Sequence, residues 1–280
     1  MSSPECIVLD FDGTFTRVEE EAVPFEEAFR RGLGERFPEV AARWDRARDE
    51  VERSPDRYGR EHDGLVVAPS HADPYVRCAA IGQILLDEAG VRRGERTEIL
   101  DALHRAAYPL CHTVFRPEAG AVLGALAATS IPTFVVTNSA THQVEAKLQA
   151  LTAGRGAIVV RGDARKFVLH EPDRRDPAFD ALPEHIAVSG LERPIYLRRG
   201  HYFEALRRIW DETGAGPERT LVCGDIFELD LAMPAHLGAQ VHLVTRPTTP
   251  DYERRAVRAM IGGSTSADLG GLLARLELPG

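Results

Sequence analysis

The chain of 280 residues has a formal net charge of -9, which argues against nucleic-acid binding because phosphate backbones are recognised mainly by clustered lysines and arginines. Its hydrophobic fraction of 44% suffices for a sizeable core, and no apolar run approaches the roughly 18 residues needed to cross a bilayer. The four cysteines are widely separated and form no CxxC pair, so neither a disulfide framework nor a zinc site is expected. We therefore predict a soluble, cytoplasmic monomer or homodimer with reduced thiols and no nucleic-acid or membrane partner.

The first apolar run, CIVLDF at 6–11, predicts a buried strand at the start of the chain. The residues that follow it, 16–115, contain charged stretches with apolar residues at three-to-four spacing, which predicts helices, and no convincing strand. Within them, 54–74 is rich in Pro, Gly, His and Asp and is expected to form a long loop with a part in substrate recognition. Residues 16–115 are therefore interpreted as a helical insert placed directly after the first strand.

Short apolar runs alternate with helical patterns after the insert. The runs show little polar alternation, as is typical of parallel strands covered on both faces. The sequence therefore predicts an α/β fold with a doubly wound parallel sheet, formed by a core domain of 1–15 and 116–280. Residues 154–199 exceed what one crossover needs, and a turn followed by a second strand at 166–169 is expected there. The other expected strands are 133–139, 157–160, 194–199, 220–225 and 241–244, and the expected helices are 117–129, 140–153, 200–214, 230–238 and the tail 266–280.

Polar side chains follow several of these strands at their carboxyl ends, where ligands bind in open parallel sheets. Carboxylates, a hydroxyl and a cation at one edge suit the handling of phosphate around Mg²⁺, which prefers oxygen ligands. We expect Asp10 and Asp225 to be side-chain metal ligands. Asp12 would offer its main-chain carbonyl and keep its carboxylate for proton transfer, while Asp230 would hold water or a neighbouring group. The strand-end residues are Asp10, Asp12, Thr137, Asn138, Ser139, Arg198, Arg199 and Asp225, with Asp230 five residues after the last.

The motifs at these positions resemble those of the haloacid dehalogenase-like hydrolases. The run from Asp10 to Thr14 matches the family's DxDGT signature, Thr137 at a strand end matches its second motif, and GDIFELD at 224–230 matches its GDxxxxD fourth motif. The three motifs occur in the family's order, and the resemblance spans positions 6 to 245. It also implies that the insert 16–115 is a cap of the type called C1, which closes over a small substrate.

The resemblance implies a Mg²⁺-dependent phosphatase that acts on a small phosphorylated metabolite. Asp10 would be the nucleophile that forms an aspartyl phosphate, and Asp12 would protonate the leaving oxygen. Thr137 and the main-chain N–H of Asn138 would bind the phosphoryl oxygens, and Gly13 is grouped with them as a substrate-binding residue. Family members that dehalogenate lack an acid at the place of Asp12, which therefore favours phosphoryl chemistry.

The third motif of the family departs from the usual pattern here. The family places a lysine, usually followed by proline, after the strand that precedes the fourth motif, but YLRRGHYFEAL at 196–206 contains neither residue. Arg199 is our first candidate for the catalytic cation, Arg198 the second and Lys166 the third. Two alternatives to a phosphatase stay open: a phosphomutase that shares the core residues, and a catalytically silent binding or regulatory protein.

Overall fold

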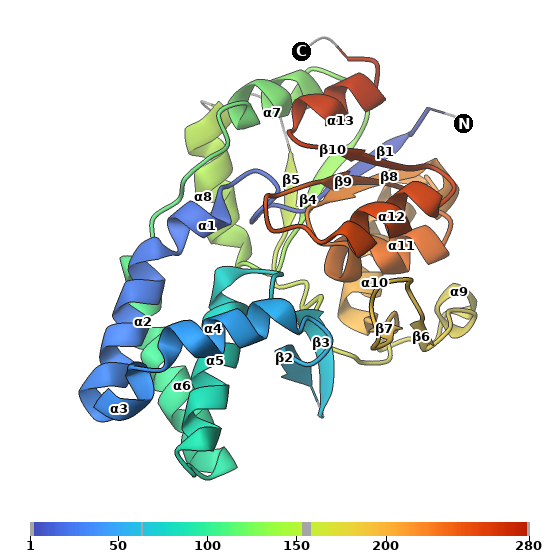
Figure 1. The fold of residues 1–280 in the computed structure, drawn as a ribbon. Coiled ribbons are helices and arrows are strands. Elements are labelled where there is room, and N and C mark those ends of the chain that lie inside the picture. The colour runs from blue at the N-terminus through green and yellow to red at the C-terminus, as the bar shows by residue number, and fades with distance from the viewer. Residues whose placement is uncertain (1–2, 63, 153–157, 279–280) are drawn as a thin grey trace. The chain divides into compact units, whose positions relative to one another are not determined.

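The chain forms two compact units in a computed structural model that describes residues 3–62, 64–152 and 158–278. The first unit combines Met1–Thr16 with Phe115–Gly280, and the second is Arg17–Val114. These limits lie one residue from the boundaries predicted for core and insert. Figure 1 shows the elements of each unit.

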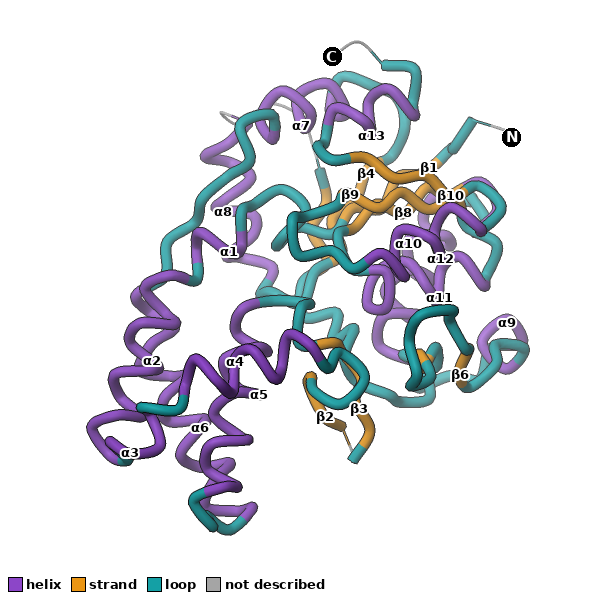
Figure 2. The backbone as a smooth tube through the Cα atoms, viewed as in Figure 1, coloured by secondary structure: helices purple, strands orange, loops and turns teal. Residues whose placement is uncertain are grey.

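A six-stranded parallel sheet forms the centre of the first unit and confirms the predicted fold class. Its strand order is β10-β9-β8-β1-β4-β5, and every neighbouring pair is parallel. Figure 2 shows these strands in orange with helices around them. The strands are β1 (Cys6–Leu9), β4 (Thr133–Val136), β5 (Val159–Arg161), β8 (Thr220–Gly224), β9 (Gln240–Val244) and β10 (Gly263–Ser266).

Alternating side chains of β1 enter two separate apolar clusters, as strand geometry requires. Cys6 and Val8 belong to one cluster, which contains residues of α10. Ile7 and Leu9 belong to the other, which contains residues of α7. The sheet is therefore buried on both faces, which explains its unbroken apolar runs. The helices of this unit are α7 (Ala119–Ala127), α8 (Thr141–Thr152), α9 (Pro177–Asp180), α10 (Gly200–Thr213), α11 (Ala232–His236), α12 (Asp251–Ala259) and α13 (Gly270–Arg275).

Two strand predictions for this unit were wrong, and one strand of the sheet was not predicted. The run 194–199 does not join the central sheet, because β7 (Ile195–Tyr196) pairs antiparallel with β6 (His185–Ile186) in a hairpin of its own. The expected strand 166–169 is a turn and loop, and β10 was not predicted because its sequence, GSTS, carries no apolar residue. Residues 153–157, at the ends of two further expected elements, lie outside the described part of the chain.

The second unit is mainly helical around an apolar core that includes Phe25, Phe29 and Trp44. The expected loop 54–74 contains an antiparallel hairpin of β2 (Gly59–His62) and β3 (Leu65–Pro69), which corrects the prediction of an insert without strands. Asp63 of that loop lies outside the described residues. The helices are α1 (Val18–Glu21), α2 (Val23–Arg36), α3 (Pro38–Ala41), α4 (Trp44–Arg53), α5 (Pro74–Glu88) and α6 (Arg93–Ala107), followed by a 3₁₀ turn, η1 (Tyr108–Leu110).

The four cysteines and the helix lengths bear on the remaining predictions from composition. Cys6, Cys78, Cys111 and Cys223 are all free in the structure. Within the described ranges, no helix is both long and apolar enough to span a membrane.

Candidate active site

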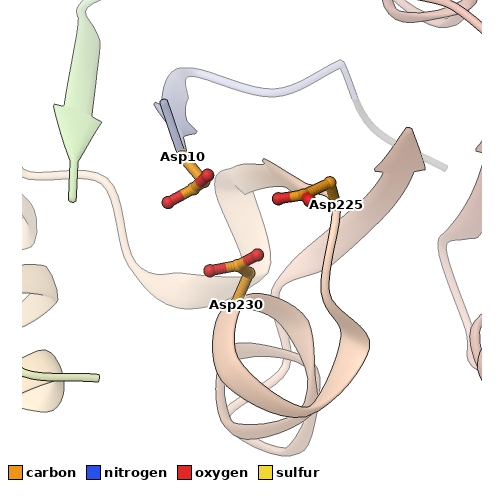
Figure 3. A group of neighbouring side chains, drawn as sticks. All are labelled: Asp10, Asp225 and Asp230. Carbon is orange, nitrogen blue, oxygen red and sulfur yellow. The ribbon is translucent and has the colours of Figure 1, made fainter. Parts of the chain in front are cut away.

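Three aspartates gather at the carboxyl ends of adjacent strands. Asp10 directly follows β1 and Asp225 directly follows β8, so the parallel pairing of these strands brings the two side chains to one edge. Asp230 belongs to the π-helical turn η3 (Phe227–Leu231) that comes next. One carboxylate oxygen from each residue lies within 4.8 Å of the others, and all three residues are buried. Figure 3 shows the three side chains directed toward a common space.

The segment after β1 turns sharply to place Asp10 against Asp225. Gly13 adopts a φ of +86°, and a Cβ there would lie 2.3 Å from Oδ2 of Asp225, so only glycine fits. The Thr14 hydroxyl lies 3.0 Å from Oδ2 of Asp10 and 3.2 Å from Oδ1 of Asp225. Because a hydroxyl has one proton, Thr14 donates to one carboxylate at a time and links the two. The GT pair of the first motif thus shapes the cluster.

Lys166 is the cation next to Asp10. Its ammonium donates to Oδ1 of Asp10 at 2.7 Å and to Oδ1 of Asp230 at 2.8 Å, and its side chain is 1% exposed. This placement reverses our order of candidates for the third motif, which put Arg199 and Arg198 before Lys166. The lysine follows β5, not the apolar run 194–199 that we took for the relevant strand.

The two arginines are directed elsewhere. Arg199 donates to the main-chain carbonyls of Tyr196 and Lys166, and its guanidinium lies 3.5 Å from Glu228. Arg198 donates to Glu171 at 3.0 Å and to main-chain carbonyls of the same region. The sequence favoured the two arginines because they follow an apolar run. The hydrogen bonds that place Lys166 join residues far apart in the chain, so no local pattern indicated them.

Burial governs the ionisation of the cluster. It raises the pKa of Asp10 to about 7, together with the charge of Asp230, and Lys166 opposes this rise. Burial would lower the pKa of Lys166, but the charges of Asp10 and Asp230 outweigh it, so its pKa is raised and the ammonium stays charged. The pKa of Asp225 is also raised well above its ordinary value by burial, against the attraction of Arg246.

Arg246 is a site residue that sequence reasoning missed, although it lies two residues after the end of β9. Its Nε lies 2.9 Å from Oδ2 of Asp225, and both side chains are less than 5% exposed. The contact is an ion pair without hydrogen-bond geometry, and Oδ2 of Asp225 accepts no hydrogen bond from the described residues. An acceptor oxygen in a buried carboxylate cluster suits a hard cation.

The donor set therefore fits a divalent metal ion. Asp10 and Asp225 are the better side-chain ligands, because they share the single proton of the Thr14 hydroxyl and Oδ2 of Asp225 accepts no hydrogen bond, whereas each oxygen of Asp230 has a donor of its own. Oδ1 of Asp230 accepts from Lys166, and Oδ2 accepts from the main-chain N–H of Ile226 at 3.0 Å. Asp230 thus holds Lys166, as expected of a residue that acts through a neighbour.

Asp12 stands apart from this cluster. Its carboxylate accepts hydrogen bonds from Ser139 at 2.6 Å, Lys147 at 3.2 Å and Thr137 at 3.4 Å. The Asp12 side chain is 30% exposed, against 10% for Asp10. Two carboxylates only two positions apart therefore have different environments, one enclosed and one open to solvent. Lys147 lies inside α8 and gave no signal in the sequence.

The strand end at Thr137 also supports the loop that contains Lys166. The main-chain N–H of Lys166 donates to Oδ1 of Asn138 at 2.7 Å, and that of Ala164 donates to the carbonyl of Thr137 at 3.0 Å. The N–H of Asp163 donates to the carbonyl of Ser139 at 3.0 Å. The second and third motifs are therefore one connected structure. The roles of Thr137 and Asn138 in binding phosphate remain predictions.

Comparison with known proteins places these features in a family. The family model described as haloacid dehalogenase-like hydrolase matches residues 4–238. The chain belongs to this family of hydrolases, whose members typically use a divalent metal ion. No curated protein matches the chain.

Solved structures share the fold at low sequence identity. YfnB of Bacillus subtilis, a structure with bound magnesium, has a TM-score of 0.53 at 14% identity and covers 99% of this chain and 100% of its own. A predicted phosphoglycolate phosphatase from Haemophilus somnus 129PT has a TM-score of 0.52 at 14% identity, covering 98% of both chains. A hydrolase of the same family from Deinococcus radiodurans R1, with bound phosphate and sodium, has a TM-score of 0.51 at 17% identity and covers 98% and 96%.

Proposed function

We propose that the protein is a Mg²⁺-dependent phosphatase that cleaves a small phosphorylated metabolite through an aspartyl phosphate. The observation that supports this most strongly is the buried group of Asp10, Asp225 and Asp230 around Lys166, with the carboxylate of Asp12 held separately. In this proposal the carboxylate of Asp10 attacks the phosphoryl group and the carboxyl group of Asp12 moves a proton. The free cysteines support the expected cytoplasmic location.

Asp10 would attack phosphorus through its carboxylate, forming an acyl phosphate as the bond to the leaving oxygen breaks. Lys166 holds Oδ1 of Asp10 and Thr14 reaches Oδ2, so the nucleophile is fixed before substrate arrives. Asp10 and Asp225 would hold Mg²⁺, which would neutralise charge between the carboxylate and the anionic phosphoryl group. Lys166 contributes fixed positive charge at the same place.

Asp12 would give its proton to the leaving oxygen and then take one from the water that hydrolyses the acyl phosphate. Its partial exposure allows exchange of protons with solvent between these steps. Ser139 and Lys147 contact the oxygens of Asp12 in the structure, so both contacts must break when Asp12 turns to a substrate. An acid at this position favours phosphoryl transfer over dehalogenation within the family.

Two of the similar structures support the proposed cofactor and substrate class. YfnB binds magnesium, and the Deinococcus radiodurans hydrolase binds phosphate. The choice among phosphorylated metabolites depends on parts of the protein other than the carboxylate cluster, and a specificity role for the cap remains a prediction.

A panel of sugar, nucleotide and small organic phosphates tests the proposal directly. We expect inorganic phosphate release that requires Mg²⁺, stops with EDTA and is absent in Asp10→Asn. Formation of an isomeric phosphate ester without net release would indicate the phosphomutase. No turnover of any panel member, together with no Mg²⁺ binding by calorimetry, would favour the silent binding protein.

A further inference from the structure

We propose that Arg199 is a positioning residue that holds the main chain of Lys166 and, through Glu228, joins the lysine's loop to the turn that contains Asp230. The arginine at the strand end does not supply the charge next to Asp10. It fixes the lysine that does. Only the activity part of this proposal rests on the proposed phosphatase function.

Arg199 is placed to restrain Lys166 at its carbonyl group. Its side chain is 0% exposed, and its Nη1 donates to the main-chain carbonyl of Lys166 in a short hydrogen bond. Its Nε donates to the carbonyl of Tyr196 at 3.0 Å. A planar guanidinium can make both bonds and still face a carboxylate, which an ammonium cannot do in the same geometry.

Glu228 connects this arginine with the acidic cluster. Its side chain is 0% exposed and accepts two hydrogen bonds from Arg193, at 3.0 Å and 2.6 Å, while Arg199 lies 3.5 Å away. Glu228 is also part of η3, two positions before Asp230. A movement of Arg199 would therefore disturb both the loop that contains Lys166 and the turn that contains Asp230. These two segments meet where the Lys166 ammonium contacts Asp230.

The loop 162–166 needs such restraints because its backbone is strained. Asp163 and Arg165 have φ values of 54° and 44°, in the left-handed region that residues other than glycine adopt only at an energetic cost. Hydrogen bonds to the strand end at 137–139 hold its amides, and Arg199 holds its last carbonyl. Lys166 has no regular element of its own, and α10 begins only at Gly200.

The proposal explains the departure from the family's third motif. In the pattern that the sequence resembles, a proline follows the lysine and limits the backbone there. Phe167 occupies that place here, and a long segment separates Lys166 from the next helix of the core. We infer that the hydrogen bond from Arg199 restrains the main chain of Lys166 in place of the missing proline.

Hydrogen–deuterium exchange of Arg199→Met and Arg193→Met, analysed by mass spectrometry, separates this role from general stability. Both variants remove one guanidinium from Glu228, and Arg199 in addition donates a hydrogen bond to the main-chain carbonyl of Lys166. We expect amides of peptides covering 162–166 to exchange at least about 10-fold faster in Arg199→Met, and to stay near the wild-type rate in Arg193→Met. Equal exchange in the two variants, or wild-type protection in Arg199→Met, would overturn the proposal.

The activity arm uses the same variants with the best substrate. A positioning role predicts that Arg199→Met lowers kcat by about 10- to 100-fold with little change in KM, and that Arg193→Met lowers it less. Arg199→Lys, which keeps a charged donor, should recover part of the loss. If Arg199→Met does not fold, Arg199→Gln takes its place in both arms. Wild-type protein without turnover would defeat the proposed function and leave the exchange result to decide this proposal.

Discussion

Two buried charged groups lie next to each other in the core unit and differ in composition. The first gathers three aspartates around Lys166 and Arg246, so carboxylates outnumber cations. The second pairs Glu228 with Arg193 and Arg199, so cations outnumber carboxylates. Burying unbalanced carboxylates is costly unless a further cation joins them, which points to a metal ion and chemistry in the first group. The second group forms its hydrogen bonds within the protein, which indicates a structural role.

The comparison is tested most strongly at Lys166, whose ammonium belongs to the first group and whose main-chain carbonyl accepts a hydrogen bond from Arg199 of the second. Lys166→Met removes the ammonium between Asp10 and Asp230, and we expect kcat to fall by about 10³-fold, as when a fixed electrostatic donor is lost. Lys166→Arg should not restore activity, because a planar fork does not fit the place of a compact ammonium. Steady-state kinetics at saturating Mg²⁺ measures both. Near-normal turnover of Lys166→Met would show that the first group does not work as described.

Asp12 lies outside both groups and tests the separation of roles. We expect Asp12→Asn to slow turnover by about 10²-fold or more, because the leaving oxygen loses its proton donor. Mg²⁺ affinity should change little, since the carboxylate of Asp12 is directed to Ser139 and Lys147. Calorimetry provides the affinity and phosphate release the rate. An unchanged rate would assign proton transfer to another residue.

Glu228→Gln tests the claim that the second group is structural. The substitution leaves Arg193 and Arg199 buried without their shared negative charge, and we expect the free energy of unfolding to fall by about 3 kcal/mol. Chemical denaturation of the variant measures this loss. Residual turnover should remain detectable, in contrast to Asp10→Asn. A variant with wild-type stability would contradict the structural reading of the group.

His242 extends the comparison to a buried group that stays neutral. Burial lowers the pKa of His242 to about 4, and its ring nitrogens contact Ser264 and Ser266. The unfolded chain binds this proton at a higher pH than the folded protein does, so stability falls as pH decreases from about 6.5 to 4, by up to about 3 kcal/mol. Denaturation across this range should show a smaller loss in His242→Asn. An equal loss would place the effect on other groups.

The acidic cluster could be predicted because its residues are recognisable from short stretches of sequence. Asp10 and Asp225 end apolar runs, and parallel strands bring such ends together without further information. The hairpin β2–β3 was missed because GREH at 59–62 is polar and mostly exposed, so it shows no strand pattern. Lys166 was ranked below Arg199 because its position depends on hydrogen bonds to Asp10 and to residues at 137–139, and no local pattern reports such contacts.

The most direct test is to locate the phosphoryl group during turnover. The wild-type protein would be mixed with Mg²⁺ and the best substrate and quenched during the first turnovers with borohydride, which reduces an acyl phosphate to an alcohol. Peptide mass spectrometry then identifies the modified position. We predict homoserine in place of Asp10 and an unmodified Asp225. Continued phosphate release with position 10 unmodified would contradict Asp10 as the nucleophile.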